Sequence, residues 1–541
     1  MGHSRRRLHR RRQLVGIMVG LSAAVAVVVA AFLLARSQRG VVDDVEALAE
    51  QREAAAARET VAESTLQGST ITQGRVLEAA SHLRGDPKGA IADARRMLEE
   101  DPRSQEALDL LTLAYDRVRA LGLSQAEEAT LREEEIDDYR RVLRRNPDWP
   151  EVLFRSSFHR LALQRLRPGD SAQAQAAVSE LRRLIDTLEA RGAVQDLPAA
   201  HNQLGRAYRH LGDAVGLKRG PSSEIERFYA LALARFRTVL GLDPNRVDAL
   251  GETVLVYQAT KAFDQARDAV ASHLPKITSA EARAKAFEML GALYIQLGKS
   301  DQAIETFHAA LEVDDSLQGA YLYLSQLYSE RGSMQQAEET LRVGLRTQPR
   351  FLEAHLQLAQ LLQQQSRFAD AITSLETALQ IDPSEAMFMG AGGAAVAPSR
   401  NLYRNRLYYS AAASIAWLYL ENAHEPKKAL AAVDRARQYE EAEPHLLDTL
   451  GWIYHALGDD ERAVATLQSA AMRESFPAVH YHLAQIYRKQ GRLEMAKHEV
   501  QESLRSGLEF EDRQDAERLN RYLDEQLTSR TAAKNTSALP R

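Results

Sequence analysis

The chain has 541 residues and a mass of 60.3 kDa, which is too long for one compact core and corresponds to roughly three or four domains or one elongated array. Hydrophobic residues make up 45% and charged residues 26%, with 29 Gly and 16 Pro, and these proportions exclude a disordered or a fibrous chain. The net charge of −5 argues against a general nucleic-acid binder, and the absence of cysteine excludes disulfides, thiolate metal sites and a cysteine nucleophile.

The N-terminal segment has the pattern of a membrane anchor. Residues 1–12 are basic and contain six arginines, whereas residues 13–35 are apolar and carry no charge. This stretch is long enough, as a helix, to cross a hydrocarbon layer of about 30 Å. We therefore expect a transmembrane helix at 13–35, a cytoplasmic N-terminus and a helical stalk over 36–70. A cleaved signal peptide and a twin-arginine export signal are the alternative interpretations.

A step of 34 residues recurs through the centre of the chain. Within each step, large apolar residues recur at helical spacing, a turn follows, and a second amphipathic run comes after it, which predicts a pair of helices. Small residues such as Gly291 lie where the two helices must approach closely. The positions that keep the step are Leu290, Leu324 and Leu358, then Ala303, Ala337 and Ala371, and finally Pro349 and Pro383.

The segment from Gly291 to Ser316 (GALYIQLGKSDQAIETFHAALEVDDS) resembles the tetratricopeptide repeat at nearly every signature position, with Asp315 in place of the closing proline. HEAT and armadillo repeats have longer periods, and a pentatricopeptide RNA reader would need a basic face that this chain lacks. The resemblance implies an all-α fold, in which the N-terminal transmembrane helix is followed by an α-solenoid, a right-handed superhelix of helix-turn-helix repeats.

The repeat pattern divides the rest of the chain into a solenoid with one interruption. Stacked repeats bury one another's apolar faces, so the last repeat needs a polar cap. The expected parts are irregular N-terminal repeats at 71–283, three regular repeats at 284–385, a Gly/Ala-rich insertion loop at 386–408, three C-terminal repeats at 409–510, a capping helix at 511–527 and a disordered tail at 528–541.

By resemblance, the first helix of each repeat lines the concave surface. The central repeats place a polar and nearly uncharged wall there, made of Gln326, Glu330, Gln360, Gln363 and Gln364. The C-terminal repeats place aromatic and charged residues there, and these are the candidate peptide-binding residues: Trp417, Asp448, Trp452, His455, Tyr481, Arg488 and Lys489. Two Trp and a Tyr with cationic neighbours are typical of a hot spot for an extended peptide with an acidic group. The alternative is that Trp417 and Trp452 fill space between neighbouring first helices.

The sequence contains no arrangement that points to catalysis. HExxH, GxSxG and Rossmann patterns are absent, and His480 and His482 point apart on a helix because they are two residues apart. Gly390, Gly392 and Gly393 are not followed by the Lys-Ser/Thr pair of a phosphate-binding loop. We therefore expect a protein that is not an enzyme, with no catalytic residue, no cofactor and no metal site.

These features together predict a membrane-anchored scaffold that docks peptides or partner proteins on the concave face of the superhelix, in a bacterial envelope assembly. The expected partners are proteins or peptides and, through residues 13–35, the inner membrane, but no nucleic acid. The expected location is the bacterial inner membrane, as a single-pass protein with the repeats in the periplasm. One alternative is a regulatory subunit or adaptor of an envelope polysaccharide or surface-protein export system, and another is a membrane regulator of reversed topology with a cytoplasmic array.

Overall fold

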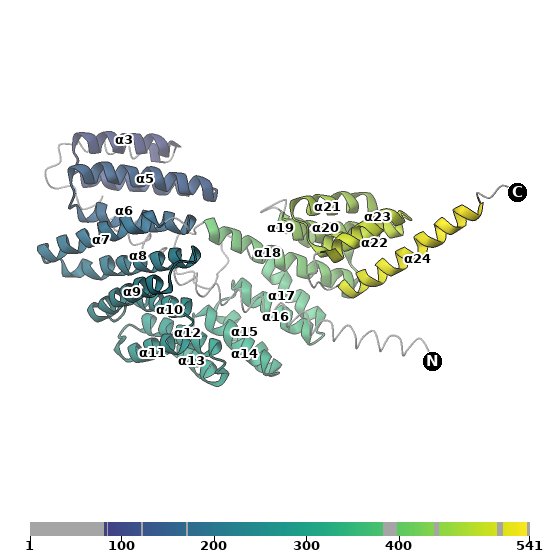
Figure 1. Ribbon diagram of the computed structural model, residues 1–541. Coiled ribbons are helices and arrows are strands. Elements are labelled where there is room, and N and C mark those ends of the chain that lie inside the picture. Colours follow the sequence, from purple (N-terminus) through teal and green to yellow (C-terminus); the bar gives the residue numbers. More distant parts are fainter. Residues whose placement is uncertain are drawn as a thin grey trace. The chain divides into compact units, whose positions relative to one another are not determined.

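The computed structural model describes residues 81–83, 85–120, 123–168, 171–381, 398–437, 443–505 and 512–537, with the backbone alone at 398–406 and 531–537. Every regular element in these ranges is a helix (Figure 1). The described residues form two compact units, one up to Tyr323 and one from Leu324 onward, apart from the first turn of α18, which groups with the former.

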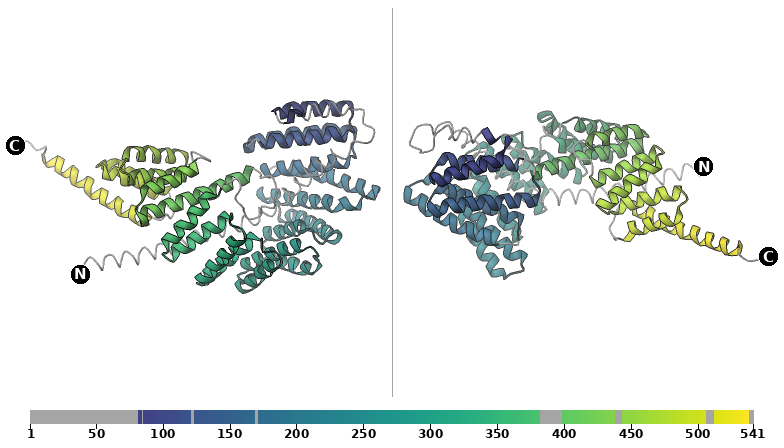
Figure 2. Two further views of the ribbon diagram at one scale, coloured as in Figure 1. Left: turned by 180° about the vertical axis from the view of Figure 1, so that it is seen from behind. Right: turned by 90° about the horizontal axis from the view of Figure 1, so that it is seen from above.

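The N-terminal unit consists of consecutive antiparallel helices, which lie side by side along the chain (Figures 1 and 2). Its helices are α3 (Pro87–Glu100), α4 (Gln105–Arg119), α5 (Gln125–Arg145), α6 (Pro150–Leu166), α7 (Ala172–Arg191), α8 (Leu197–Leu217), α9 (Ser222–Leu242), α10 (Val247–Ala259), α11 (Phe263–His273), α12 (Ala280–Gln296), α13 (Ser300–Val313) and the first part of α14 (Gln318–Glu330), with the short helical turns η1 (Val194–Asp196) and η2 (Leu274–Lys276).

Longer helices absorb the extra residues that interrupt the 34-residue step in this unit. Both α8 and α9 have 21 residues, whereas α13, in the regular repeats, has 14. The segments 150–190 and 246–277, whose repeat signatures are weak, form the expected helix pairs α6 with α7 and α10 with α11. The irregular spacing therefore changes the length of the helices and leaves their alternation intact.

Small residues hold the two helices of a repeat close together, as predicted. A Cβ atom added to Gly291 on α12 would lie 2.8 Å from the ring of Phe307 on α13, and Phe307 is itself fully buried. At Gly205 on α8 the corresponding distance to the ring of Phe236 on α9 is 2.4 Å. Gly298 ends α12 with a φ of +69°, a conformation that costs glycine little and other residues more.

Charged side chains are buried between the first helices of the N-terminal unit. Arg155 on α6 donates from Nη2 to Asp109 on α4 at 2.9 Å, across a sequence separation of 46 residues. Further along, Arg209 on α8 donates from Nε to Glu252 on α10 at 2.8 Å, across 43 residues. Asp109, Arg155 and Glu252 are each at least nine-tenths buried. Such pairs fix the register of one repeat on the next because an unpaired buried charge is costly.

A second buried network surrounds His159 on α6. Arg132 on α5 donates from Nη1 to the Nδ1 atom of His159 at 3.0 Å, and a guanidinium cannot accept, so Nδ1 carries no proton. The proton therefore sits on Nε2, which lies 3.2 Å from the carboxylate of Glu135. Burial, aided by the positive charges of Arg119, Arg132 and Arg155, lowers the pKa of His159 well below its ordinary value. His159 is thus held neutral as one tautomer.

The C-terminal unit continues the alternation of first and second helices. It contains the rest of α14, α15 (Met334–Thr347), α16 (Leu352–Gln364), α17 (Phe368–Gln380), α18 (Pro398–Leu418), a π-helical turn η3 (Tyr419–Ala423), α19 (Pro426–Arg437), α20 (Pro444–Ala456), α21 (Asp460–Arg473), α22 (Pro477–Lys489), α23 (Leu493–Arg505) and α24 (Arg513–Ser537).

Two boundaries in this unit differ from the prediction. Helix α18 begins at Pro398, so the second half of the segment 386–408, predicted as a loop, is helical from the residue whose fixed φ favours the first turn of a helix. Helix α24 continues to Ser537 instead of ending at 527, because no Pro or Gly interrupts the sequence between those residues. The part of the insertion before Pro398 lies outside the described residues.

The helices of the structure do not agree with the expected location in a membrane. In the part of the chain that the structure describes, no helix is both long and apolar enough to cross a membrane. The long helices α8, α9 and α24 all carry charged residues along their length, as repeat and capping helices with one polar face do. The segment 13–35, to which the membrane helix was assigned, and the segments 1–12 and 36–70 lie outside the described residues. The structure therefore does not support the predicted single-pass membrane location.

Candidate functional site

Four aromatic rings meet on the first helices of the C-terminal repeats. Trp417 on α18 and Trp452 on α20 have ring centroids 6.5 Å apart, and both side chains are partly exposed. His482 on α22 stacks on Trp452 at 4.7 Å and lies 5.7 Å from Trp417, while His455 on α20 lies 5.0 Å from Trp452. We call Trp417, Trp452, His455 and His482 the aromatic cluster. The structure thus brings together three predicted residues and one that was not predicted.

The buried end of the aromatic cluster is fixed by a hydrogen bond between His482 and Asp448. The Nδ1 atom of His482 lies 2.8 Å from the carboxylate of Asp448, and both side chains are buried. Because a carboxylate only accepts, Nδ1 is the donor. The bond joins α22 to α20 and holds the imidazole where it stacks on Trp452. One face of Trp452 is therefore in a packing contact, as the alternative interpretation of the two Trp residues proposed.

The exposed end of the aromatic cluster is occupied by a second His–carboxylate pair. The Nδ1 atom of His455 lies 2.6 Å from Asp460, at the start of α21, and Lys489 lies 3.3 Å from the same carboxylate. Burial acts to raise the pKa of Asp460, but the hydrogen bond from His455 and the charge of Lys489 outweigh it and the pKa is lowered. Lys489, predicted to hold a partner's acidic group, is therefore already bound to Asp460.

Tyr481 and Arg488 lie beside the aromatic cluster on α22. The hydroxyl of Tyr481 accepts from Gln485, and its ring is 6.1 Å from His482. Arg488 is exposed and donates to the amide oxygen of Gln485 at 3.2 Å. All seven predicted residues consequently lie in one neighbourhood, although Tyr481 and Asp448 are buried.

Two further carboxylates border this neighbourhood, and the sequence did not single them out. Asp512, just before α24, has a pKa raised by burial, to which the charges of Glu421 and Asp448 add, while His482 opposes the shift. Glu421 is exposed on η3, the π-helical turn that begins two residues after Trp417. Single π-helical turns of this kind occur frequently at functional sites.

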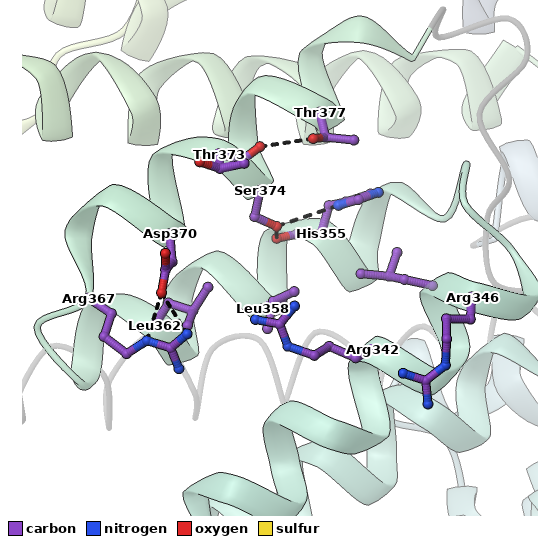
Figure 3. A pocket seen from close by; sticks show the side chains of 11 residues that line it. Arg342, Arg346, His355, Leu358, Leu362, Arg367, Asp370, Thr373, Ser374 and Thr377 are labelled. Atoms are coloured by element: carbon purple, nitrogen blue, oxygen red, sulfur yellow. Dashed lines mark hydrogen bonds and ion pairs between the residues drawn. The ribbon is translucent and has the colours of Figure 1, made fainter.

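The central repeats contain a separate hollow of about 450 Å³ between α15, α16 and α17, which none of the predicted wall residues lines (Figure 3). Arg342, Arg346 and Arg367 line it, but their charges are matched. Glu338 binds Arg342 at 2.8 Å and Arg367 at 2.7 Å, and Glu339 binds Arg346 at 2.8 Å. No predicted binding residue lines this hollow, and we assign no ligand to it. Among the described residues, no group of three or more His, Asp or Glu side chains is arranged to hold a metal ion.

Family models of the tetratricopeptide repeat match three stretches of the chain. They cover residues 288–386, as overlapping matches at 288–350 and 325–386, and then residues 446–475 and 477–506. These stretches fall on α12 to α17 and on α20 to α23, which are alternating first and second helices. A search of curated proteins found no match.

Several solved structures are similar to the chain. A tetratricopeptide repeat protein from Parabacteroides merdae is 15% identical over 51% of this chain and 97% of its own, with a TM-score of 0.32. Yeast Tom70 is 14% identical over 86% of this chain and 99% of its own, with a TM-score of 0.36. Pseudomonas aeruginosa pilF is 16% identical over 41% of this chain and 90% of its own, with a TM-score of 0.31. At these values the likeness carries no conclusion about partner or activity. The residues that the family models match, 288–386, 446–475 and 477–506, are tetratricopeptide repeats.

Proposed function

We propose that the chain is a non-enzymatic scaffold whose C-terminal repeats dock an extended segment of a partner protein across the aromatic cluster. The tetratricopeptide repeat fold supports a protein-protein interaction scaffold in general. The observation that carries the narrower proposal is the pair of partly exposed Trp rings on successive first helices, 6.5 Å apart. Large, rigid aromatic side chains supply much of the binding energy in protein interfaces, at a small cost in conformational entropy.

The arrangement around the two Trp rings suits binding without rearrangement. His482 covers one side of Trp452 and is itself held by Asp448, so the ring is fixed before a partner arrives. A surface that is ordered in advance loses less entropy on binding. The neighbouring polar groups, Gln485 and Arg488, can hydrogen-bond to a peptide backbone because they lie at or near the surface.

Selection from a random peptide library on the full chain tests the proposal. Selected peptides should bind about ten-fold or more weakly to Trp452→Ala, and more weakly to Arg488→Ala, which removes an exposed side chain and leaves the packing intact. Tyr522→Ala is the matched control, because Tyr522 is an aromatic residue 44% exposed on α24. This control should bind as the unchanged protein does.

Thermal unfolding of each variant separates binding from packing. Binding that survives in both Trp452→Ala and Arg488→Ala would contradict the proposal. A different outcome is that Trp452→Ala loses binding because its C-terminal repeats unfold, while Arg488→Ala binds normally. This outcome would show that the Trp residues serve packing alone.

A further inference from the structure

The charges around the aromatic cluster differ from those expected from the sequence. Four carboxylates lie in or beside the cluster: Asp448 bonds His482, Asp460 bonds His455, Glu421 lies on η3 four residues after Trp417, and Asp512 directly precedes α24. Of the two predicted cations, Lys489 is bound to Asp460, and Arg488 extends from the end of α22 beside Gln485. Because these four carboxylates outnumber the two cations, the rings have a negative surrounding.

A negative surrounding and an aromatic face favour the same kind of ligand. The face of an indole ring carries negative potential and attracts a cation that lies over it within about 6 Å. Carboxylates beside such a ring add to this attraction and repel an anion. A partner's carboxylate would be repelled by Glu421, the exposed carboxylate beside the rings. The chemistry of the site thus fits a positive side chain better than the acidic group predicted from the sequence.

We propose that the aromatic cluster binds an arginine or lysine side chain carried by the docked segment of a partner protein, with the cation over the exposed faces of Trp417 and Trp452. This inference rests on the proposed function and names the chemistry of its partner. Glu421 contributes the exposed carboxylate, while Asp448 acts through His482 and holds the ring geometry. Glu421 is therefore the residue whose charge can be removed without disturbing a buried contact.

The chain offers a direct spectroscopic readout. It contains three Trp residues, and the Trp149→Phe variant leaves Trp417 and Trp452 as the only indole fluorophores. The full chain carrying Trp149→Phe is titrated with an acetylated, amidated peptide Gly-Ser-Arg-Gly-Arg-Ser-Gly. Matched peptides carry citrulline or glutamate in place of both arginines. Citrulline keeps the shape of arginine and removes the charge.

We expect saturable fluorescence change with the arginine peptide, binding about ten-fold or more weaker with the citrulline peptide, and none with the glutamate peptide. Glu421→Gln should weaken the arginine peptide several-fold. Glu461→Gln, the same change at an exposed position on α21, is the matched control and should have no effect. Added salt should reduce the difference in affinity between the arginine and the citrulline peptide, because salt screens the charge of the exposed carboxylate.

Equal binding of the arginine and citrulline peptides, or tighter binding of the glutamate peptide, would overturn the cationic preference, and so would the absence of a saturable signal with the arginine peptide. The library selection distinguishes this failure from failure of the proposed function. Selected peptides that depend on Trp452 but are not enriched in Arg or Lys would leave the docking surface in place and remove only the cationic ligand. Selected peptides whose binding is unchanged in Trp452→Ala would contradict both the docking surface and the cationic ligand.

Discussion

The imidazole of His482 hydrogen-bonds to the carboxylate of Asp448 at 2.8 Å, although the two residues are 34 positions apart in the sequence. The bond connects the first helices of two successive repeats, α20 and α22, at a point where both side chains are buried. It also sets the orientation of the ring that stacks on Trp452. One polar contact therefore links the packing of the repeats to the geometry of the candidate site.

The first prediction concerns the energetic coupling of this pair. Asp448→Leu removes an acceptor of the buried imidazole and should lower the free energy of unfolding of the C-terminal repeats by about 1–3 kcal/mol. His482→Phe keeps a ring against Trp452 but leaves the carboxylate without this donor, and the loss should be at least as large. The double variant should lose less free energy of unfolding than the sum of the losses in the two single variants. Urea unfolding of all four proteins in the Trp149→Phe background, followed by fluorescence, measures the coupling, and strict additivity would contradict it.

The second prediction concerns the close approach of α12 and α13. Gly291→Ala places a methyl group 2.8 Å from the ring of Phe307, which is fully buried and cannot easily move, so we expect a loss of about 1–3 kcal/mol. Gly241→Ala on α9 is the matched control, since nothing lies within 4 Å of the added atom. It should stabilise the helix by about 0.5–1 kcal/mol. Thermal and chemical unfolding should show shifts of opposite sign in the two variants.

The third prediction concerns pH. The pKa of His159 is lowered in the folded protein, whereas in the unfolded chain it lies near 6.5, so the unfolded chain takes up the proton first. The stability contributed by neutral His159 is therefore complete above about pH 6.5 and is lost as the pH falls below that value, by up to about 1.4 kcal/mol per pH unit.

His159→Gln is the matched variant for the pH experiment. Its amide can accept from Arg132 and donate to Glu135 without ionising. Burial raises the pKa of Glu135 and gives it the opposite trend, with stability lost as the pH rises through the raised pKa; Glu135 is present in both proteins and largely cancels in the difference. The free energy of unfolding of the unchanged protein should fall more steeply than that of His159→Gln between pH 6.5 and 5, as about one proton taken up per molecule predicts. Parallel curves would refute the assignment.

The fourth prediction concerns the end of the array. Ala516, Leu519 and Leu523 are buried on α24, and Lys497 on α23 binds Asp524 at 2.7 Å. Truncation after Leu527 should therefore leave the melting temperature within a few degrees of the full chain. Truncation after Arg505 exposes the apolar face of α23 and should cause aggregation or loss of the last repeat, because a solenoid needs a polar cap. Size-exclusion chromatography and circular dichroism distinguish the two results, and a stable, monomeric shorter chain would show that α24 is not the cap.

The sequence predicted the alternation of helices well, because the apolar and small residues that carry it are local. Gly291 and Ala303 mark the contact between α12 and α13 in the sequence itself. The buried charges could not be predicted in the same way. Asp109 and Arg155 read as residues of a solvated helix face, and only the packing of α4 against α6 shows that each is the other's partner.

The sequence indicated which side chains lie near one another at the candidate site, but not which charged side chains are already paired there. The repeat pattern placed Trp417 and Trp452 on equivalent positions of successive first helices, and the structure brings their rings together. The repeat pattern could not show that Lys489 is bound to Asp460, because the two residues belong to different repeats, at the end of α22 and the start of α21. His482 was missed because a buried polar residue on a first helix has no pattern of its own.

The buried pairs between first helices restrict how this array can be rearranged. Asp109 with Arg155, Glu252 with Arg209, and Asp448 with His482 each divide one contact between two successive repeats. Excising one repeat of such a pair would leave the side chain on the other repeat without its partner, and duplicating it would add a side chain that has none. The repeats therefore have a fixed order. A chain with its repeats in another order would keep its helices but would bury polar side chains without partners at the new junctions.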